Sequence, residues 1–391
     1  MDIIYMDNNA TTRIDPRVLD AMMPYLTEFY GNASSMHSFG GSVGRVIAEA
    51  REKVANLIHA EPGEIIFTSC GTESDSTAIY AAIRSNPNKK HLITSRVEHP
   101  AVKNLYEYLA KTGYHITWVP VDKEGTLDME YLRQHLSDDT ALVSIMWANN
   151  ESGVIFPIAE IAELLRGKGI VFHTDAVQAV GKIPVDVRQV GVDMLSMSGH
   201  KFHGPKGLGV LYVRKGTKFS PFLIGGHQER GRRGGTENAA SIVGLGRAGE
   251  LAQGDLEAMN TRVRALRDRL EQGLLKAIPN ALLNGKKDQR LPNTTNISFE
   301  YVEGEAILLM MDAFGICASS GSACTSGSLE PSHVMRAMGV PFTAAHGSIR
   351  FSLSTYNTEK EVDFVIEHMP PIIERLRLMS PFWKKGVCNL Q

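Results

Sequence analysis

Between residues 64 and 202, short apolar runs end in polar clusters and are followed by helical patterns. The segments EIIFTSCGTESDSTAIYAAIR and HLITSRVEHPAVKNLYEYLAK both read as strand, turn and helix, and Pro100 stands where a helix can begin. ALVSIMWANNESG, GIVFHTDAVQAVG and DMLSMSGHKF add three further strands. Because fully apolar strands alternate with helices, this pattern predicts an α/β fold whose mostly parallel sheet is covered on both faces.

Polar residues follow the predicted strands where their carboxyl ends meet. In open parallel sheets ligands bind beyond these ends. The positions concerned are Cys70–Thr72, Glu98–His99, Asn149–Asn150, His173–Asp175 and Ser198–Lys201. The pattern therefore indicates one site along this edge of the sheet.

The rest of the chain predicts a smaller α+β unit. A long charged amphipathic helix is expected from about Asp255 to Ile278, as a bridge between two domains. TTNISFEY and GSIRFSLS are typical of strands, and EGEAILLMMDAF and TEKEVDFVIEHM of helices. The pair Pro370–Pro371 is expected to kink or break the last helix.

Composition excludes several classes of function. The 391 residues carry a net charge of -2, so there is no overall basic field to attract nucleic acid or a membrane surface. No apolar stretch approaches the length of a membrane span, and MDIIYMDNNATT lacks the basic start of a signal peptide. Four cysteines make no disulfide framework, and the histidines form no compact metal-binding set. We therefore expect a soluble cytoplasmic protein with reduced thiols, no metal site, and no nucleic-acid or membrane partner.

The segment GLGRAG at 244–249 matches a dinucleotide-binding pattern but lacks a clear preceding strand. It reads more easily as part of a small-residue helix.

Lys201, in SMSGHKFHGPKGLGVLYV, follows a predicted strand and precedes another. A lone lysine in a turn is usually solvated, but burial turns an amine into a competent Schiff-base nucleophile. Asp175 offers the carboxylate that a pyridinium nitrogen needs, and Gly71 and Thr72 near a helix start can bind a phosphate. Amine, carboxylate and phosphate cradle are the three anchors of pyridoxal 5'-phosphate (PLP).

The motifs TDAVQAVGK, SGHKFHGPKG, GGHQERGRRGGTENAAS, EGEAILL, SSGSACTSGSLEPSHVMRAMG and AAHGSIRFSLS together resemble cysteine desulfurases of the NifS/IscS type, with NifS the closer group. The similarity runs from MDNNATT almost to the C-terminus. It implies a PLP-dependent homodimer of fold type I. Residues 15–254 would form the large domain, with a mostly parallel seven-stranded sheet. Residues 1–14 and 255–391 would form the smaller α+β domain, which carries a catalytic loop at about 319–332.

The resemblance also implies roles for individual residues. Lys201 matches the Schiff-base lysine, Asp175 the partner of the pyridine nitrogen, and His99 the ring stacked on the cofactor. Gln178 matches the residue near the phenolic oxygen. Phosphate contacts are expected from Gly71, Thr72, Ser198 and His200, and across the dimer interface from Thr236. Asn149 and Arg350 match the groups that hold the substrate carboxylate, although Arg350 alone also fits an ordinary ion-pairing strand residue.

Cys324 lies in SSGSACTSGS, where Ser and Gly predict a flexible loop rather than a buried thiol. The resemblance makes it the nucleophile that takes sulfur from L-cysteine, leaving alanine and a persulfide. A loop that swings between pocket and surface then suits transfer to an iron–sulfur scaffold protein. The alternatives are a disulfide with Cys317, which a reducing cytosol disfavours, or an incidental cysteine. Cys317 and Cys70 read as structural, and Cys388 carries no signal.

We thus expect a cysteine desulfurase that supplies iron–sulfur cluster assembly, where nitrogenase-specific and housekeeping roles would use the same residues. The alternatives are another PLP enzyme of this fold, such as a selenocysteine lyase or a small-substrate aminotransferase, or a non-catalytic platform that has kept the fold. Cys324 favours the desulfurase over the aminotransferase, and intact Lys201, Asp175 and His99 disfavour the platform.

Overall fold

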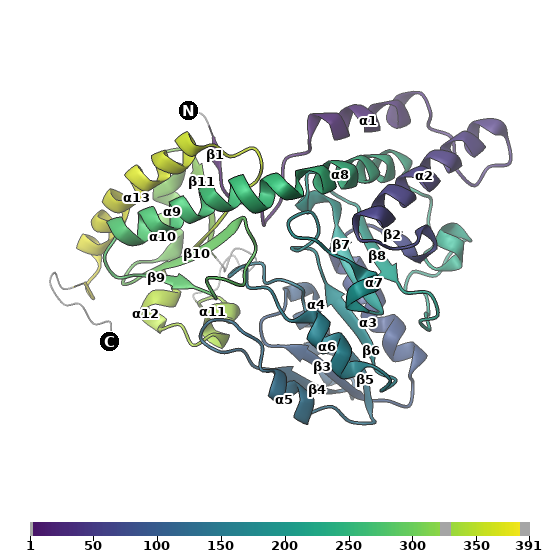
Figure 1. Cartoon of the computed structure of the whole chain (residues 1–391), viewed down its shortest axis with the longest axis horizontal. Coiled ribbons are helices and arrows are strands. Elements are labelled where there is room, and N and C mark those ends of the chain that lie inside the picture. Colours follow the sequence, from purple (N-terminus) through teal and green to yellow (C-terminus); the bar gives the residue numbers. More distant parts are fainter. Residues whose placement is uncertain (1–2, 321–329, 384–391) are drawn as a thin grey trace.

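The computed structural model describes residues 3–320 and 330–383, and its largest element is a seven-stranded sheet (Figure 1). Its strands are β2 (Ile65–Thr68), β3 (His91–Ser95), β4 (His115–Val119), β5 (Thr140–Ser144), β6 (Val171–Asp175), β7 (Met194–Ser198) and β8 (Gly209–Val213). They lie in the order β2-β8-β7-β6-β5-β3-β4, and only β8 runs antiparallel to its neighbours. The predicted mostly parallel sheet of an α/β fold is confirmed, and the strands that precede the polar clusters all end at one edge.

Helices cover both faces of this sheet. They are α1 (Pro16–Thr27), α2 (Ser38–Leu57), α3 (Gly71–Ser85), α4 (Pro100–Lys111), α5 (Met129–Gln134), α6 (Ile158–Leu165), α7 (Val187–Val190) and α8 (Ala239–Ala258). Successive residues of β2 show the two-sided burial, because Ile65 and Phe67 pack into one apolar core and Ile66 into the other. A strand buried on both faces has to be apolar throughout, which is why these runs do not alternate.

A smaller sheet forms the second unit, in the order β12-β13-β10-β9. Its strands are β9 (Ala281–Asn284), β10 (Thr294–Phe299), β12 (Ser319–Ser320) and β13 (Ser348–Ser352), and beside it β1 (Ile4–Tyr5) pairs with β11 (Ile316–Cys317). The helices of this part are α9 (Arg264–Ala277), α10 (Gly304–Asp312), α11 (His333–Ala337), α12 (Phe342–Ala345) and α13 (Glu359–Met379). Of these, α9, α10 and α13 pack around a separate apolar core, whereas buried residues of α11 and α12 join the core of the large sheet. The domain limits after residues 14 and 254 stay a prediction.

The helix predicted from Asp255 to Ile278 is present but starts earlier. α8 begins at Ala239 and continues through a π-helical turn at Met259–Val263 into α9. In Figure 1 the two helices run end to end between the parts of the molecule. GLGRAG lies inside α8, as predicted, and a Cβ atom at Gly246 would come 2.8 Å from Cα of Ala50 on α2. Small residues therefore serve close helix packing here.

Of the predicted kink or break at Pro370–Pro371, the break is wrong, because α13 continues through both prolines. The helix buries Val362, Val365 and Met369 on one side, whereas Pro371 is exposed. Packing of this apolar face against α9 outweighs the lost hydrogen bonds of the two prolines.

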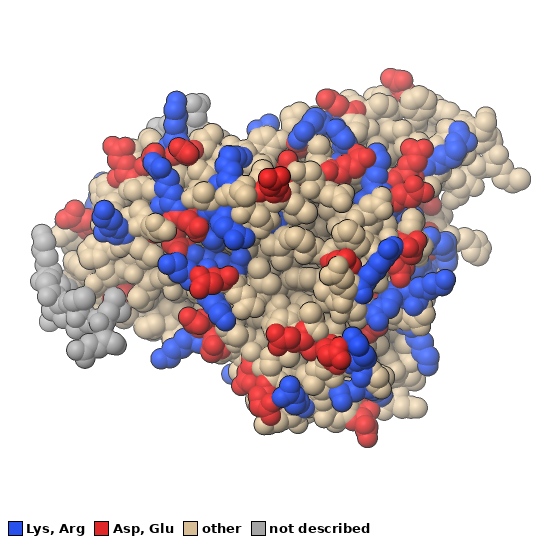
Figure 2. All heavy atoms as spheres, in the orientation of Figure 1, with Lys and Arg blue, Asp and Glu red and all other residues tan. Residues whose placement is uncertain are grey.

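Figure 2 shows basic and acidic side chains interspersed over the visible face of the molecule. Among the residues that the structure describes, no helix combines the length and the apolar character needed to cross a membrane.

Candidate active site

A cavity of about 520 Å³ lies at the carboxyl-terminal edge of the seven-stranded sheet, and residues of the smaller sheet close its other side. Most of the predicted site residues line it: Gly71, Thr72, His99, Asp175, Gln178, Ser198, His200, Lys201 and Arg350. They come from the ends of four strands of the large sheet, β2, β3, β6 and β7, and from β13. The cavity has the size typical of cofactor sites.

One end of the cavity suits an anion. Gly71 and Thr72 open α3, a helix of 15 residues whose first N–H groups have no carbonyl partner within the helix. A Cβ atom at Gly71 would lie 3.0 Å from Val177 Cγ2, so glycine keeps this approach open. The Ser198 hydroxyl is buried without a hydrogen-bond partner among the described residues. Because buried hydroxyls are normally paired, this oxygen is well placed for a phosphate.

Lys201 follows β7 in a short 3-10 turn at Gly199–Lys201. Its Nζ donates to the backbone oxygens of Asn9 at 2.6 Å and of Ala10 at 2.8 Å. Two carbonyls from the N-terminal segment thus hold the amine at the cavity wall, where it can be released toward a carbonyl compound.

Asp175 ends β6, and its Oδ1 accepts a hydrogen bond from Val177 N at 2.9 Å. Burial raises the pKa of this carboxyl, while the positive charge of Lys201 lowers it. Asp75 on α3 also lines the cavity, and burial together with the Asp175 charge raises its pKa. A buried carboxylate is stabilised by a positively charged group beside it. The two neighbouring carboxyls therefore suit the protonated ring nitrogen of PLP.

His99 is held as a neutral ring. It caps α4, and its Nδ1 accepts from Ala101 N at 3.2 Å. Burial, followed by the charges of Lys201, His333 and Arg350, lowers its pKa to about 4. Because Nδ1 accepts a hydrogen bond, the neutral ring carries its proton on Nε2. This nitrogen then acts only as a hydrogen-bond donor. For His99 to protonate a leaving sulfur it would first have to take up a second proton.

Gln178 lines the cavity one turn beyond Asp175. Its Nε2 donates to the backbone oxygen of Asn9 at 3.0 Å, and its Oε1 accepts from Lys182 Nζ at 2.6 Å. His200 contacts the same N-terminal segment through Thr11 Oγ1 at 3.0 Å, and burial lowers its pKa to about 4. A neutral His200 still offers one N–H to an anion.

The two predicted carboxylate-binding residues differ in their settings. Arg350 lines the cavity, with Nη2 on Asp7 Oδ1 at 2.7 Å, Nη1 on Asn150 O at 2.9 Å, and Nε buried without a described partner. Asn149 is fully engaged elsewhere, since Nδ2 donates to Val97 O and Oδ1 accepts from the N–H groups of Glu151 and Ser152. It does not line the cavity, so its substrate role stays a prediction.

Thr236 lies apart from the cavity, and Cys324 cannot be placed relative to it. Thr236 lines a separate hollow of about 200 Å³ together with Glu229 and Arg233. Cys324, with most of its loop, lies outside the described residues, as does Cys388. Of the described cysteines, Cys70 lines the cavity and Cys317 is partly buried in β11.

Several cavity residues were not predicted as site residues: Asn9, Ala10, Asp75, Glu151, His333 and Arg336. Asn9 and Ala10 belong to MDNNATT, whose run of small polar residues was noted only as the start of the resemblance. Glu151 follows the Asn149–Asn150 cluster, and its carboxylate accepts from the Ser332 hydroxyl. Burial raises its pKa to about 7. Glu151 and Asp75 carry no signal in the sequence that separates them from surface acids.

Comparisons with known proteins agree with this site. The model of the aminotransferase class-V family matches residues 4–365. The chain is 60% identical to cysteine desulfurase NifS of Azotobacter vinelandii, over 97% of this chain and 95% of the relative. It is 60% identical to cysteine desulfurase 2 of Trichormus variabilis, over 98% and 96%.

Solved structures also match the fold over most of the chain. A NifS-like protein superposes with a TM-score of 0.90 at 40% identity, covering 96% of this chain and all of that one. SspA in complex with cysteine gives 0.80 at 33% identity, covering 90% and 99%.

Fold and site therefore define a PLP-dependent enzyme, and the chain belongs to the aminotransferase class-V family. Within that family it is a cysteine desulfurase. Cysteine is the substrate of this class.

Proposed function

We propose that this protein removes sulfur from L-cysteine, stores it as a persulfide on Cys324 and passes it to an iron–sulfur scaffold protein. The proposal rests on one observation above all, namely the single cavity where Lys201, Asp175, Ser198 and Arg350 converge. Similarity to the NifS of a named relative supports a role in nitrogenase cluster assembly. We place the reaction in the cytoplasm.

The residues that would hold PLP follow from their chemistry. Lys201 would bind it covalently, Asp175 would pair with the ring nitrogen, and His99 would lie against the ring. The N–H groups at Gly71 and Thr72, with Ser198 and His200, would take the phosphate. Bound there, PLP supplies an electron sink that makes the substrate Cα proton acidic.

The protein's own groups would handle protons and orientation. Lys201 Nζ, once freed by the substrate amine, would take the Cα proton. Arg350 would orient the substrate carboxylate, since a guanidinium can bind both oxygens. Its Nε has no described partner, so this fork still has a donor to offer.

Sulfur transfer would need a thiolate at Cys324. Its attack on the substrate sulfur forms an S–S bond and breaks the Cβ–S bond, whose electron pair stays with the carbon skeleton. That fragment gains protons and leaves as alanine. Cysteine and one thiol thus become alanine and one persulfide, and no external oxidant is needed.

We further propose a homodimer in which Thr236 completes the phosphate site of the other subunit. Two features support it. Thr236 faces its own hollow instead of the cavity of its own chain. In addition, Leu19, Met23 and Leu26 form an exposed apolar stripe at helical spacing on α1, as a second copy of the chain would cover.

Peptide mass spectrometry after incubation with L-cysteine, without reductant, tests the central step. We expect one added sulfur atom on the Cys324 peptide, and none in Lys201→Ala. The matched controls Cys70→Ser and Cys317→Ser should both keep it. Sulfur on Cys70, the described thiol in the cavity wall, would move the nucleophile there, and no added sulfur from a yellow, folded protein would refute the persulfide route.

A further inference from the structure

Lys182 is a buried lysine that has no carboxylate as a hydrogen-bond partner among the described residues. It stands one turn beyond Gln178, and its Nζ donates to Gln178 Oε1 at 2.6 Å and to Asn9 Oδ1 at 3.0 Å. Only 3% of its surface is exposed. Burial, followed by the charges of Lys201 and Arg350, lowers its pKa well below that of an ordinary lysine. Keeping an amine at such a place is costly, so its contacts call for an explanation.

The contacts fix which end of the Gln178 amide faces which neighbour. The Lys182 amine donates to both of its contacts, and a donor requires the amide oxygen. On the other side, the carbonyl of Asn9 requires the amide nitrogen, which donates to it at 3.0 Å. A flipped amide would place its NH2 group against the donating Lys182 amine and its oxygen against the carbonyl oxygen of Asn9. Gln178 is thereby left with its second N–H for the cavity it lines.

Asn9 ties this arrangement to the amine of Lys201. Its backbone oxygen accepts from both Gln178 Nε2 and Lys201 Nζ, while its side-chain oxygen accepts from Lys182. Its own Nδ2 donates to Thr294 Oγ1 at 2.9 Å, in the smaller sheet. Asn9 thus accepts hydrogen bonds from both lysines and from the glutamine and fixes their positions relative to each other.

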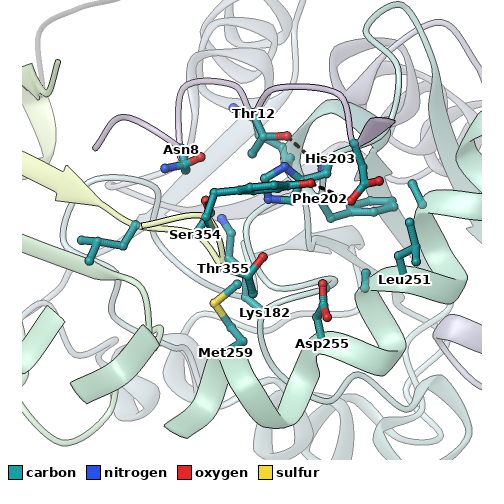
Figure 3. Close-up of a pocket in the computed structure, with 17 residues that line it drawn as sticks. Asn8, Thr12, Lys182, Phe202, His203, Leu251, Asp255, Met259, Ser354 and Thr355 are labelled. Carbon is teal, nitrogen blue, oxygen red and sulfur yellow. Dashed lines mark hydrogen bonds between the residues drawn. The ribbon is translucent and has the colours of Figure 1, made fainter. Parts of the chain in front are cut away.

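A second, smaller cavity borders both lysines. It measures about 30 Å³ and is lined by Lys182 and Lys201 together with residues of both units (Figure 3). This volume is about that of one water molecule. The two acceptor oxygens of Gln178 and Asn9 offset part of the cost of burying this amine.

We propose that Lys182 is a positioning residue, which through Gln178 presents an N–H donor to an oxyanion in the main cavity. In the proposed PLP site, on which this inference rests, that oxyanion is the phenolic oxygen. Removal of Lys182 leaves the Asn9 carbonyl as the one described contact that orients the amide, so the N–H donor is held less firmly toward the oxyanion.

A double-mutant cycle on the PLP-loaded enzyme tests this role. The variants are Lys182→Met, Gln178→Ala and the two combined, and the readouts are the PLP dissociation constant and the pH midpoint of the visible absorption band. We expect Lys182→Met to weaken PLP binding about tenfold, the loss of one charge-assisted hydrogen bond. It should also raise the pH midpoint, because donor and charge both favour the oxyanion. In the Gln178→Ala background the same change should alter binding less than about twofold.

An equal effect of Lys182→Met in both backgrounds would overturn the proposal, since a structural role does not pass through Gln178. Lys89→Met is the matched control, because Lys89 Nζ likewise donates to two oxygens, the backbone oxygens of Thr140 and Gly169, and does not line the cavity. It should leave PLP binding and the absorption midpoint unchanged.

Should Lys182→Met fail to fold, Gln178→Glu decides, since a carboxylate cannot donate to the oxyanion. It should bind PLP more weakly than Gln178→Ala, and equal or tighter binding would refute the proposal. Sulfur on Cys324 is measured separately. A coupling of the stated size without persulfide would keep this inference and reject the proposed function.

Discussion

Glu98, directly before His99, offers a sharp test of the electrostatics beneath the site. Its side chain is fully buried; Oε1 accepts from Ser95 Oγ at 2.6 Å and from Met146 N at 3.0 Å, whereas Oε2 has no described partner. Burial is the largest cause that raises its pKa, to about 8. The folded protein therefore keeps a proton on Glu98 at pH values where the unfolded chain has lost it.

The sign and size of the effect follow from this difference. An unfolded Glu ionises near pH 4.5, and the folded one near 8. Between these values the folded state binds more protons, so this group lowers the free energy of unfolding as the pH rises. From pH 5 to pH 8 the loss amounts to about 3 to 4 kcal/mol. Glu98→Gln removes it, because the amide does not titrate. The amide adds a buried N–H without a partner, which costs about 1 kcal/mol.

We expect a crossover. At pH 5 Glu98→Gln should be less stable than the unchanged protein by about 1 kcal/mol, and at pH 8 more stable by about 2 to 3 kcal/mol. Urea unfolding at saturating PLP and fixed protein concentration measures both differences. Glu107→Gln is the control, since Glu107 is an exposed partner of Lys103 on α4 and its difference should stay near zero at both pH values.

A stability difference between Glu98→Gln and the unchanged protein that does not vary with pH would refute the reasoning. It would mean that Glu98 is already ionised in the folded protein at pH 5.

Two further predictions concern the phosphate end of the cavity. Ser198→Ala should weaken PLP binding about tenfold while the PLP-free protein keeps or gains thermal stability, because the removed hydroxyl has no partner in the protein; a less stable PLP-free protein with unchanged affinity would contradict this. Gly209→Ala should lower the free energy of unfolding by about 1 to 3 kcal/mol and weaken PLP binding, because its Cβ atom would lie 2.5 Å from the carbonyl carbon of Cys70, just before Gly71. Gly63→Ala meets no atom within 4 Å, so urea unfolding and PLP titration of this variant should match the unchanged protein.

The sequence alone determined the sheet and its functional edge. A strand buried on both faces has to be apolar throughout, so the runs at β2, β3, β5, β6 and β7 were visible, and parallel strands must end together. Lys201, Asp175 and Gly71 were found because each follows such a run. The resemblance added Gln178 and Arg350, which no periodicity singles out, and gave Ser198 of the strand-end cluster its phosphate role.

Only the tertiary structure decided which polar residues share the site. Asn9 and Arg350 reach the cavity through the N-terminal segment and the smaller sheet, across more than a hundred residues of intervening chain. The continuity of α13 through Pro370 and Pro371 also depends on packing, against which local propensity is weak. The roles of Lys182 and Glu98 arise from burial. The pKa of an ionisable group depends on the dielectric and the partners around it, and these are present only in the folded chain.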